Sequence, residues 1–113
     1  MGEQMDLNKK RMELVAKFKA ASPEFMAAEY ELIRMTYKDG ALSGKMKRLM
    51  SLAIALGAGC TNCILAQTQY ALDGGASREE ILETLHVVIA MSGTTGVAEC
   101  LRVIEFIDEP EKA

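Results

Sequence analysis

The stretch "LMSLAIALGAGCTNCILAQTQYALDGG" (49–75) decides the fold that we expect for this chain. Its apolar residues recur at helical spacing on both sides of a glycine-flanked cysteine pair, Cys60 and Cys63. Glycines break the first helical run just before Cys60, and Gly74-Gly75 ends the second. The stretch therefore predicts two helices joined by a short turn, with the cysteine pair where the second helix begins.

Helical spacing continues through the rest of the chain, and no run of alternating β-branched residues suggests a strand. We expect helices over about 4–20, from Ser22-Pro23 to Asp39-Gly40, from Ser43 to the glycines before Cys60, from Cys60 to Gly74-Gly75, from Ser77 to the "SGTTG" turn at 92–96, and from that turn to the polar tail. The sequence thus predicts a single all-α domain over residues 1–113, a compact bundle of about six helices joined by short connections.

Each of these helices carries apolar residues at helical spacing. They are Met5, Met12, Val15 and Phe18 in the first helix, Phe25, Met26, Ile33 and Tyr37 in the second, Met46, Leu49, Met50, Ala53 and Leu56 in the third, Cys63, Ile64, Tyr70 and Leu72 in the fourth, Ile81, Leu82, Leu85, Val88 and Ile89 in the fifth, and Val97, Leu101, Ile104 and Ile107 in the last. The start of the fifth helix is well marked, because Ser77 and Glu80 have the spacing of a capping box.

Composition and charge limit the classes of partner. The formal net charge is −3 and no basic patch stands out, so we expect no nucleic-acid partner. No segment approaches the roughly 20 apolar residues that span a bilayer, and the charged N-terminus does not resemble a secretory signal, so we expect no membrane partner. Three cysteines in a chain of this kind are typical of a reducing compartment, which predicts a cytoplasmic protein.

The cysteine pair has a physical reason to be redox-active. At a helix N-terminus, free backbone N–H groups and the helix dipole stabilise a thiolate, and the thiolate is the nucleophile. We expect Cys60 at or just before the helix start and Cys63 in its first turn, a spacing that lets the sulfurs meet. Cys63 would then attack an oxidant, and Cys60 would resolve the sulfenic acid into a disulfide.

Two other interpretations of the pair stay open at this point. A structural zinc site normally repeats the pair or adds a close histidine pair, whereas only His86 and Cys100 remain, so we expect no metal ligand. The cysteines could also be buried and inert, because cysteine is among the most buried residue types. We interpret Cys100 as a core residue and His86 as a hydrogen-bonded packing residue, since both lie among apolar residues at helical spacing.

The third and fourth predicted helices suggest contact with a second subunit. Small residues lie on several faces of the run at 51–59, and a helix that is apolar on nearly all sides tends to be buried. In a chain this short, such burial favours an oligomer, and eight methionines are consistent with adaptable contact surfaces.

The segment "KMKRLMSLAIALGAGCTNCILAQTQYALDGGASREEILETL" (45–85) resembles the core of the carboxymuconolactone decarboxylase family, especially its alkylhydroperoxidase D-like branch. The preceding "SPEFMAAEYELIRMTYKDGALSGK" (22–45) fits the usual lead-in of that family. The resemblance implies an all-α fold that forms dimers, trimers or hexamers and needs no cofactor. It assigns peroxide attack to Cys63 and resolution to Cys60, with a thiol reductant, often a lipoylated protein, restoring the dithiol.

The sequence departs from that branch at three supporting positions. Gln67 stands where a histidine is usual, Arg48 where a glutamate is usual, and Asn62 where a histidine is often found. Glutamine cannot act as a general base at neutral pH, although it can hydrogen-bond a thiolate or a peroxide. Other carboxylates that would replace the missing one are Glu24, Glu29 and Glu31, on the preceding predicted helix.

These observations give one leading hypothesis and one alternative from another class. The leading hypothesis is a thiol-dependent peroxidase or disulfide oxidoreductase, weak as a peroxidase, in which Cys63 attacks, Cys60 resolves and Gln67 lines the pocket. The alternative is a non-catalytic helical oligomerisation module with inactive or regulatory cysteines. Lactone decarboxylation is disfavoured, because that branch of the family commonly uses histidines where this chain has its cysteine pair.

Overall fold

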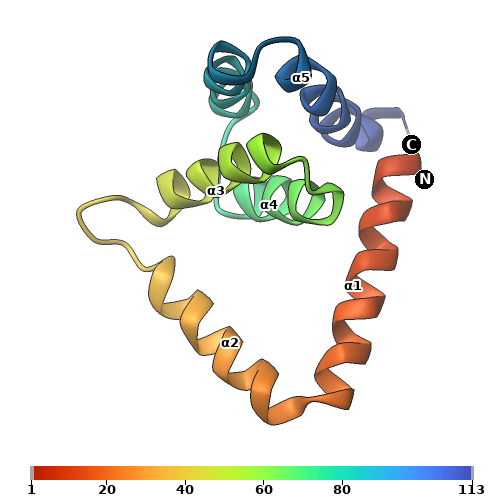
Figure 1. Cartoon of the computed structure of the whole chain (residues 1–113), viewed down its shortest axis with the longest axis vertical. Coiled ribbons are helices and arrows are strands. Elements are labelled where there is room, and N and C mark those ends of the chain that lie inside the picture. Colours follow the sequence, from red (N-terminus) through yellow and green to blue (C-terminus); the bar gives the residue numbers. More distant parts are fainter. Residues whose placement is uncertain (1, 113) are drawn as a thin grey trace.

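The structure, a computed structural model of the chain, describes residues 2–112 and contains no strand among them. Its helices are α1 (Glu3–Ala21), α2 (Pro23–Thr36), α3 (Gly44–Ala58), α4 (Thr61–Asp73) and α5 (Arg78–Lys112). Figure 1 shows α3, α4 and α5 gathered on one side, while α1 and α2 diverge from them. The predicted all-α fold is confirmed.

The last helix consists of two helical segments. Gly93 has φ 63° and ψ −140°, which interrupts α5 and turns the chain between residues 78–92 and 94–112. Glycine adopts this conformation without the steric cost that a Cβ would bring. The break predicted at 92–96 is therefore present, and the expected sixth helix is the second segment of α5.

The hydrophobic core lies between α3, α4 and α5. Its fully buried larger side chains include Leu52, Leu56, Ile64, Ile81 and Val103. The face predicted for the fifth helix is confirmed, because Ile81, Leu85 and Val88 are buried and Leu82 and Ile89 pack against the core. The face predicted for the third helix is confirmed at Leu49 and Leu56, but Leu52 and Ala55 are buried in place of the exposed Met46 and Met50.

Side-chain caps fix where α3 and α5 begin. The Ser43 hydroxyl accepts a hydrogen bond from the Met46 backbone N–H at 3.0 Å, as its sequence position predicted. Ser77 and Glu80 form the predicted capping box, with Glu80 N donating to Ser77 Oγ at 3.1 Å and Ser77 N donating to Glu80 Oε1 at 2.8 Å. The same Glu80 carboxylate pairs with Lys45 at 2.8 Å, and this contact, assisted by the Ser77 backbone, lowers the pKa of Glu80.

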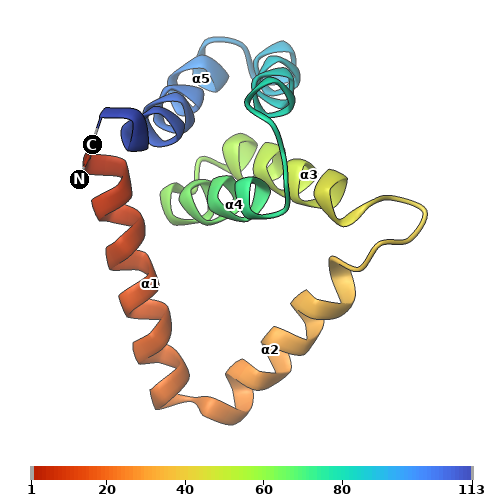
Figure 2. The same cartoon turned by 180° about the vertical axis from the view of Figure 1, so that it is seen from behind.

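Helices α1 and α2 form an open V beside the core, which we call the arm (residues 3–36). Figures 1 and 2 show the two helices meeting at one corner and leaving the core at different places. Helix α2 has no buried residue and, within the described chain, packs against no helix other than α1. The arm therefore contacts the core through α1, which packs against α4 and α5, and joins it again through the turn after α2.

The first end of the arm is docked through polar groups. The carboxylate of Glu109, itself buried, accepts hydrogen bonds from the backbone N–H groups of Gln4 and Met5, both at 2.7 Å. Arg102 Nη1 donates to Gln4 Oε1 at 2.7 Å, and Gln4 Nε2 donates to Glu105 at 3.3 Å. Because the free N–H groups of a helix start attract anions, Glu109 acts as an N-cap for α1 from the far end of the chain.

The apolar face predicted for the first helix is wrong for this chain considered alone. Gln4 and Asn8 are the buried residues of α1, whereas Met12, Val15 and Phe18 are exposed. The reason is that α1 docks through its polar N-terminal turns, so its apolar residues face the opening of the arm. Hydrophobic spacing identifies a face but cannot identify which chain covers it.

The second end of the arm is a turn over residues 37–43. Helix α2 ends at Thr36, and Gly40 does not have the left-handed conformation expected of a helix-ending glycine there. Instead, the ammonium of Lys47 donates to the carbonyls of Thr36 and Lys38 at 2.9 and 2.6 Å, and Asp39 accepts from the Gly44 N–H at 2.6 Å. A lysine from α3 thus supplies the hydrogen bonds that close α2.

Residues Arg78–Glu109 of α5 are long and apolar enough to cross a membrane by length and composition alone, with a mean hydropathy of 1.5. The break at Gly93 divides this run into a segment too short for a span and a segment that carries charged residues along its length. Core helices of proteins outside membranes meet the same criterion.

We expect Glu109→Gln to destabilise the docking of α1. The substitution replaces a carboxylate with an amide that can accept through one oxygen only, and charge-assisted hydrogen bonds contribute about 1.5–3 kcal/mol each. The free energy of unfolding in urea should fall by about 2 kcal/mol, and the first amides of α1 should exchange hydrogen faster. Glu13→Gln, at an exposed position of α1, is the control and should change neither measurement. Equal stability of the two variants would contradict the role given to Glu109.

Candidate functional site

The turn between α3 and α4 places the cysteine pair. Gly59 ends α3 in the left-handed conformation, with φ 70° and ψ 28°, and its N–H donates to the carbonyls of Ala55 and Leu56 at 3.0 and 3.2 Å. The N–H of Cys60 also donates to the Ala55 carbonyl, at 3.3 Å. A glycine at this position satisfies the end of one helix and lets the next begin after a single residue.

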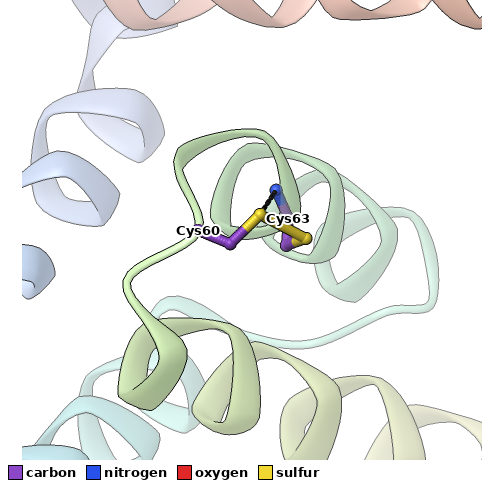
Figure 3. The surroundings of a disulfide bond; sticks show 2 residues. All are labelled: Cys60 and Cys63. Carbon is purple, nitrogen blue, oxygen red and sulfur yellow. Dashed lines mark hydrogen bonds between the residues drawn. A yellow bond between two sulfur atoms is a disulfide. The ribbon is translucent and has the colours of Figure 1, made fainter.

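Cys60 is the N-cap residue of α4. Its sulfur accepts a hydrogen bond from the Cys63 backbone N–H at 3.3 Å, in the way that a serine hydroxyl usually caps a helix. Figure 3 shows this contact and the disulfide bond between the two sulfurs. The Cα atoms of Cys60 and Cys63 are 5.2 Å apart. The predicted positions of both cysteines, and the predicted approach of their sulfurs, are confirmed.

The two cysteines differ in their access to solvent. Cys63 is exposed and lines a cavity, whereas Cys60 is half-buried against the end of α3. The third cysteine, Cys100, is buried in the core as predicted, where burial, with help from the charge of Glu99, raises the pKa of its thiol. Only the pair at the start of α4 therefore offers an accessible sulfur.

The cavity beside Cys63 lies inside the angle of the arm and has a volume of about 360 Å³. Its lining residues are Arg11, Leu14, Val15 and Phe18 from α1, Met26 from α2, and Asn62, Cys63, Ala66 and Gln67 from α4. Volumes of a few hundred Å³ are typical of sites for small organic molecules. The first turn of α4 thus meets the apolar side of the arm around Cys63.

Arg48 reaches the cavity only through Gln67. Its guanidinium lies between two tyrosine rings, 3.4 Å from the centroid of Tyr37 and 4.4 Å from that of Tyr70, and its Nη1 donates to Gln67 Oε1 at 3.5 Å. Cation–π contacts with both rings hold this guanidinium in place. Gln67, one helical turn after Cys63, is therefore held by Arg48 while it lines the cavity.

The carboxylates expected to replace the missing glutamate do not reach the site within one chain. Glu24, Glu29 and Glu31 are exposed on α2, where Glu31 pairs with Arg34, and none of them lines the cavity. This expectation is wrong because the residue of α2 that turns toward Cys63 is Met26.

The expectation that His86 is a packing residue is also wrong. Its side chain is exposed on α5, away from the cavity. Among residues 2–112, no cluster of three or more histidine, cysteine or acidic side chains is arranged to hold a metal ion.

The structure brings Arg11 to the site, although no pattern in the sequence predicted it there. Arg11 lines the cavity from the middle of α1, and its Nε donates to Asn8 Oδ1 at 2.9 Å. Arg11 lies in a charged stretch of the sequence that is typical of a solvent-exposed helix face. It differs from the neighbouring charged residues only because α1 approaches α4 at this position. The apolar residues of α1 were recognised, but as core rather than as a cavity wall.

Comparisons with known proteins agree with the fold and with the cysteine-containing core. The sequence model of the carboxymuconolactone decarboxylase family matches residues 23–106. An uncharacterised protein of Cupriavidus necator is 31% identical over 106 residues, which cover 91% of this chain and 94% of that protein.

Two crystal structures resemble the chain along most of its length. A carboxymuconolactone decarboxylase family protein from Legionella pneumophila is 32% identical, with a TM-score of 0.87 over 95% of this chain and 96% of that one. A second family member, from Thermotoga maritima, is 28% identical, with a TM-score of 0.68 over 77% of this chain and 90% of that one; a role in the antioxidative response has been suggested for it.

A pair of glycine substitutions tests how the turn positions Cys60. Gly59→Ala forces a Cβ into the left-handed region and should lower the free energy of unfolding by about 1 kcal/mol. Gly57→Ala lies within α3, where an added Cβ meets no atom within 4 Å, and should leave stability unchanged or raise it by about 0.5 kcal/mol. Urea denaturation of the reduced proteins measures both, and a Gly59 variant as stable as the Gly57 variant would show that the turn tolerates other residues.

Proposed function

Because the chain belongs to the carboxymuconolactone decarboxylase family, we propose that it is a thiol-dependent oxidoreductase that reduces peroxides or disulfides through Cys63 and Cys60. The observation that carries the proposal is the asymmetry of the pair: one sulfur is exposed in a cavity, and the other caps the helix within bonding distance of it. The suggested antioxidative role of the Thermotoga maritima relative agrees with this chemistry.

Cys63 is the attacking residue in this proposal. Its sulfur lines the cavity, so a hydroperoxide bound there meets it first, whereas Cys60 does not line the cavity. The Cys63 thiolate attacks the terminal oxygen of the hydroperoxide, the O–O bond breaks, and an alcohol leaves after taking up one proton. Cys63 is thereby oxidised to a sulfenic acid.

Cys60 is the resolving residue. In the dithiol state its sulfur lies at the N-cap of α4, where the Cys63 N–H and the helix dipole favour the thiolate. That thiolate attacks the sulfur of the Cys63 sulfenic acid and forms the disulfide, and the hydroxide that leaves takes up one proton to give water. One thiolate of an external dithiol then attacks the exposed Cys63 sulfur and expels the Cys60 thiolate, which is a good leaving group because the helix start stabilises it. The second thiol of the reductant attacks this mixed disulfide, which releases Cys63 and leaves the reductant as a disulfide.

The groups around the pair favour a slow peroxidase over a fast one. Gln67 and Arg48 stand at the positions of the usual histidine and glutamate, and neither offers the imidazole or carboxylate that serves as a general base. General acid–base assistance is typically worth about 10²–10⁴-fold in rate. Disulfide exchange needs less general acid–base assistance than peroxide reduction. The site is therefore better suited to reducing disulfides than to reducing peroxides.

We also propose that the chain works as a homo-oligomer. Its accessible surface is 7181 Å², roughly 1,000 Å² more than a compact monomer of 12.3 kDa exposes. Its radius of gyration is 14.5 Å, against about 13 Å for a compact domain of this length. The excess is of the size that each partner buries in a typical protein–protein interface.

The exposed apolar residues of α2 and of the outer face of the core are candidates for that interface. They include Phe25, Leu32 and Met35 of α2, Ile54 of α3, and Val87, Met91 and Leu101 of α5. Met91 is 84% exposed and Ile54 71%, values that are unusual for large apolar side chains covered by nothing. This surface also supports the second candidate function, a non-catalytic oligomerisation module.

The partners that follow from the proposal are a peroxide or disulfide substrate and a thiol reductant, for which a lipoylated protein is one candidate. We place the activity in the cytoplasm, because a CxxC dithiol that must be regenerated depends on a reducing compartment. No cofactor is required, since the electrons pass through the two sulfurs alone.

Thiol titration tests the proposed cycle. The reduced protein should lose two of its three free thiols on addition of one equivalent of hydroperoxide, and a dithiol should restore them. Cys63→Ser should abolish the loss, because the remaining Cys60 does not line the cavity. Cys60→Ser should leave a sulfenic acid at Cys63, which a dimedone-type reagent would trap and mass spectrometry would detect.

Cys100→Ser is the control for this titration, because the buried thiol lies outside the site. This variant should retain the full cycle. Three free thiols in the wild-type protein after peroxide and after a small disulfide would exclude the oxidoreductase and leave the oligomerisation module.

A charge placed on the exposed apolar surface tests the oligomer. Met91→Glu should reduce the molar mass measured by light scattering after size-exclusion chromatography, because burying an unpaired carboxylate in an interface costs several kcal/mol. Glu79→Gln, an exposed polar change on the same helix, should leave the mass unchanged. A wild-type protein that elutes as a monomer at micromolar concentration would contradict the proposal directly.

A further inference from the structure

The cavity beside Cys63 is larger and more apolar than a small oxidant requires. Leu14, Val15 and Phe18 of α1 form one wall, and Met26 of α2 closes the corner of the arm. Hydrogen peroxide makes no use of such a wall, because it has no apolar surface to bury. The cavity therefore fits an organic molecule with an apolar portion next to its reactive group.

The polar part of the cavity presents hydrogen-bond donors without a carboxylate. Arg11, Asn62 and Gln67 are its polar lining residues, and no acidic side chain of the described chain lines it. Arg11 makes one hydrogen bond, from Nε to Asn8 Oδ1, and within residues 2–109 its guanidinium pairs with no carboxylate. The terminal N–H groups of Arg11 are thus available to an anion in the cavity.

Gln67 adds a second donor, because Arg48 fixes which end of its amide faces the cavity. The Gln67 carbonyl oxygen accepts from Arg48 Nη1 at 3.5 Å, and the guanidinium is in turn held between the rings of Tyr37 and Tyr70. An amide whose oxygen is engaged in this way offers its NH₂ group to the other side. The charge of Arg48 also adds to the positive potential behind Gln67.

We propose that this cavity binds an amphipathic organic carboxylate, with its apolar chain against α1 and Met26 and its carboxylate on Arg11. A planar guanidinium is the side chain best suited to a carboxylate, since it can donate two parallel hydrogen bonds. The inference rests on the proposed function, because it makes the physiological substrate a hydroperoxide or disulfide that carries such a carboxylate. Arg11 is then a specificity residue, and Gln67 positions the reacting oxygen or sulfur.

Alkylation of Cys63 by iodoacetate and by iodoacetamide tests whether the cavity prefers a carboxylate, and it requires no catalytic turnover. Both alkylate the Cys63 thiolate, but only iodoacetate is an anion, so the ratio of their rate constants reports the charge preference of the cavity. A change in the pKa of the thiol affects both rates equally and cancels in the ratio. The reduced protein is treated with each reagent, and the Cys63 peptide is quantified by mass spectrometry over time.

We expect Arg11→Met to lower the ratio of iodoacetate to iodoacetamide rates about tenfold, the effect of losing one charge-assisted contact. Arg11→Lys should keep much of the preference, because it keeps the charge. Gln67→Glu, which places a carboxylate in the cavity, should lower the ratio as well. Lys10→Met removes a positive charge from an exposed neighbouring position outside the cavity and should leave the ratio unchanged. A ratio that does not change in Arg11→Met would overturn the inference.

Protection by ligands tests the apolar half of the proposed site. Octanoate should slow the reaction of Cys63 with iodoacetamide, whereas octylamine should not, and octanol should protect less than octanoate. Equal protection by octanoate and octanol would show an apolar cavity without carboxylate selection, and no protection by any of them would show that the cavity does not bind such molecules; either result overturns the inference.

The two proposals fail separately in these experiments. Charge-selective alkylation and octanoate protection in a protein that never consumes peroxide or disulfide would leave the binding site established and the proposed function wrong. A full thiol cycle with no charge preference at Cys63 would leave the oxidoreductase and remove the carboxylate substrate.

Discussion

The whole site depends on one turn, in which a left-handed glycine ends α3 and the next residue caps α4. Gly59 and Cys60 share the Ala55 carbonyl, so two helices change direction within two residues. The tight turn brings α3 and α4 together to bury Leu52, Leu56 and Ile64. The same packing that stabilises the core therefore fixes the sulfur of Cys60 at the start of a helix.

The two cysteines divide the requirements of thiol chemistry between them. A sulfur that serves as an N-cap is held in one place and electrostatically stabilised, but it is partly covered by the turn that holds it. A sulfur three residues later is exposed to the cavity and free of that contact. The local geometry of a helix start thus gives the two sulfurs different surroundings, one at the N-cap and one at the cavity, which is the difference that the proposed oxidoreductase uses.

Local sequence patterns were sufficient to predict most of the helix boundaries in the fold. The caps at Ser43 and Ser77, the position of Cys60 and the break near Gly93 follow from interactions within a few residues, and each was predicted. The buried face of α1 was not predicted, because α1 docks on Glu109, which is over a hundred residues away in the sequence. No sequence pattern predicts a contact between residues so far apart. Met46 and Met50 were placed in the core because apolar spacing does not distinguish a core from a surface that another molecule covers.

The candidate site was predictable to the same extent. Cys60, Cys63, Asn62 and Gln67 lie within two helical turns, so their proximity follows from the helix itself. That Arg48 meets Gln67 depends on the packing of α3 against α4, and the presence of Arg11 depends on the path of the arm. When residues of one site come from different helices, their spacing in the sequence does not predict that they lie close together.

The arm is connected to the core at two places. Glu109 accepts hydrogen bonds from the start of α1, and Lys47 donates hydrogen bonds to the turn over residues 37–43. Neither α1 nor α2 can swing away while both ties hold, so the width of the opening beside Cys63 is set by helix lengths and by two distant joints. An insertion in the α1–α2 or α2–α3 connection would therefore change the size of the cavity beside Cys63 without replacing any residue that lines it.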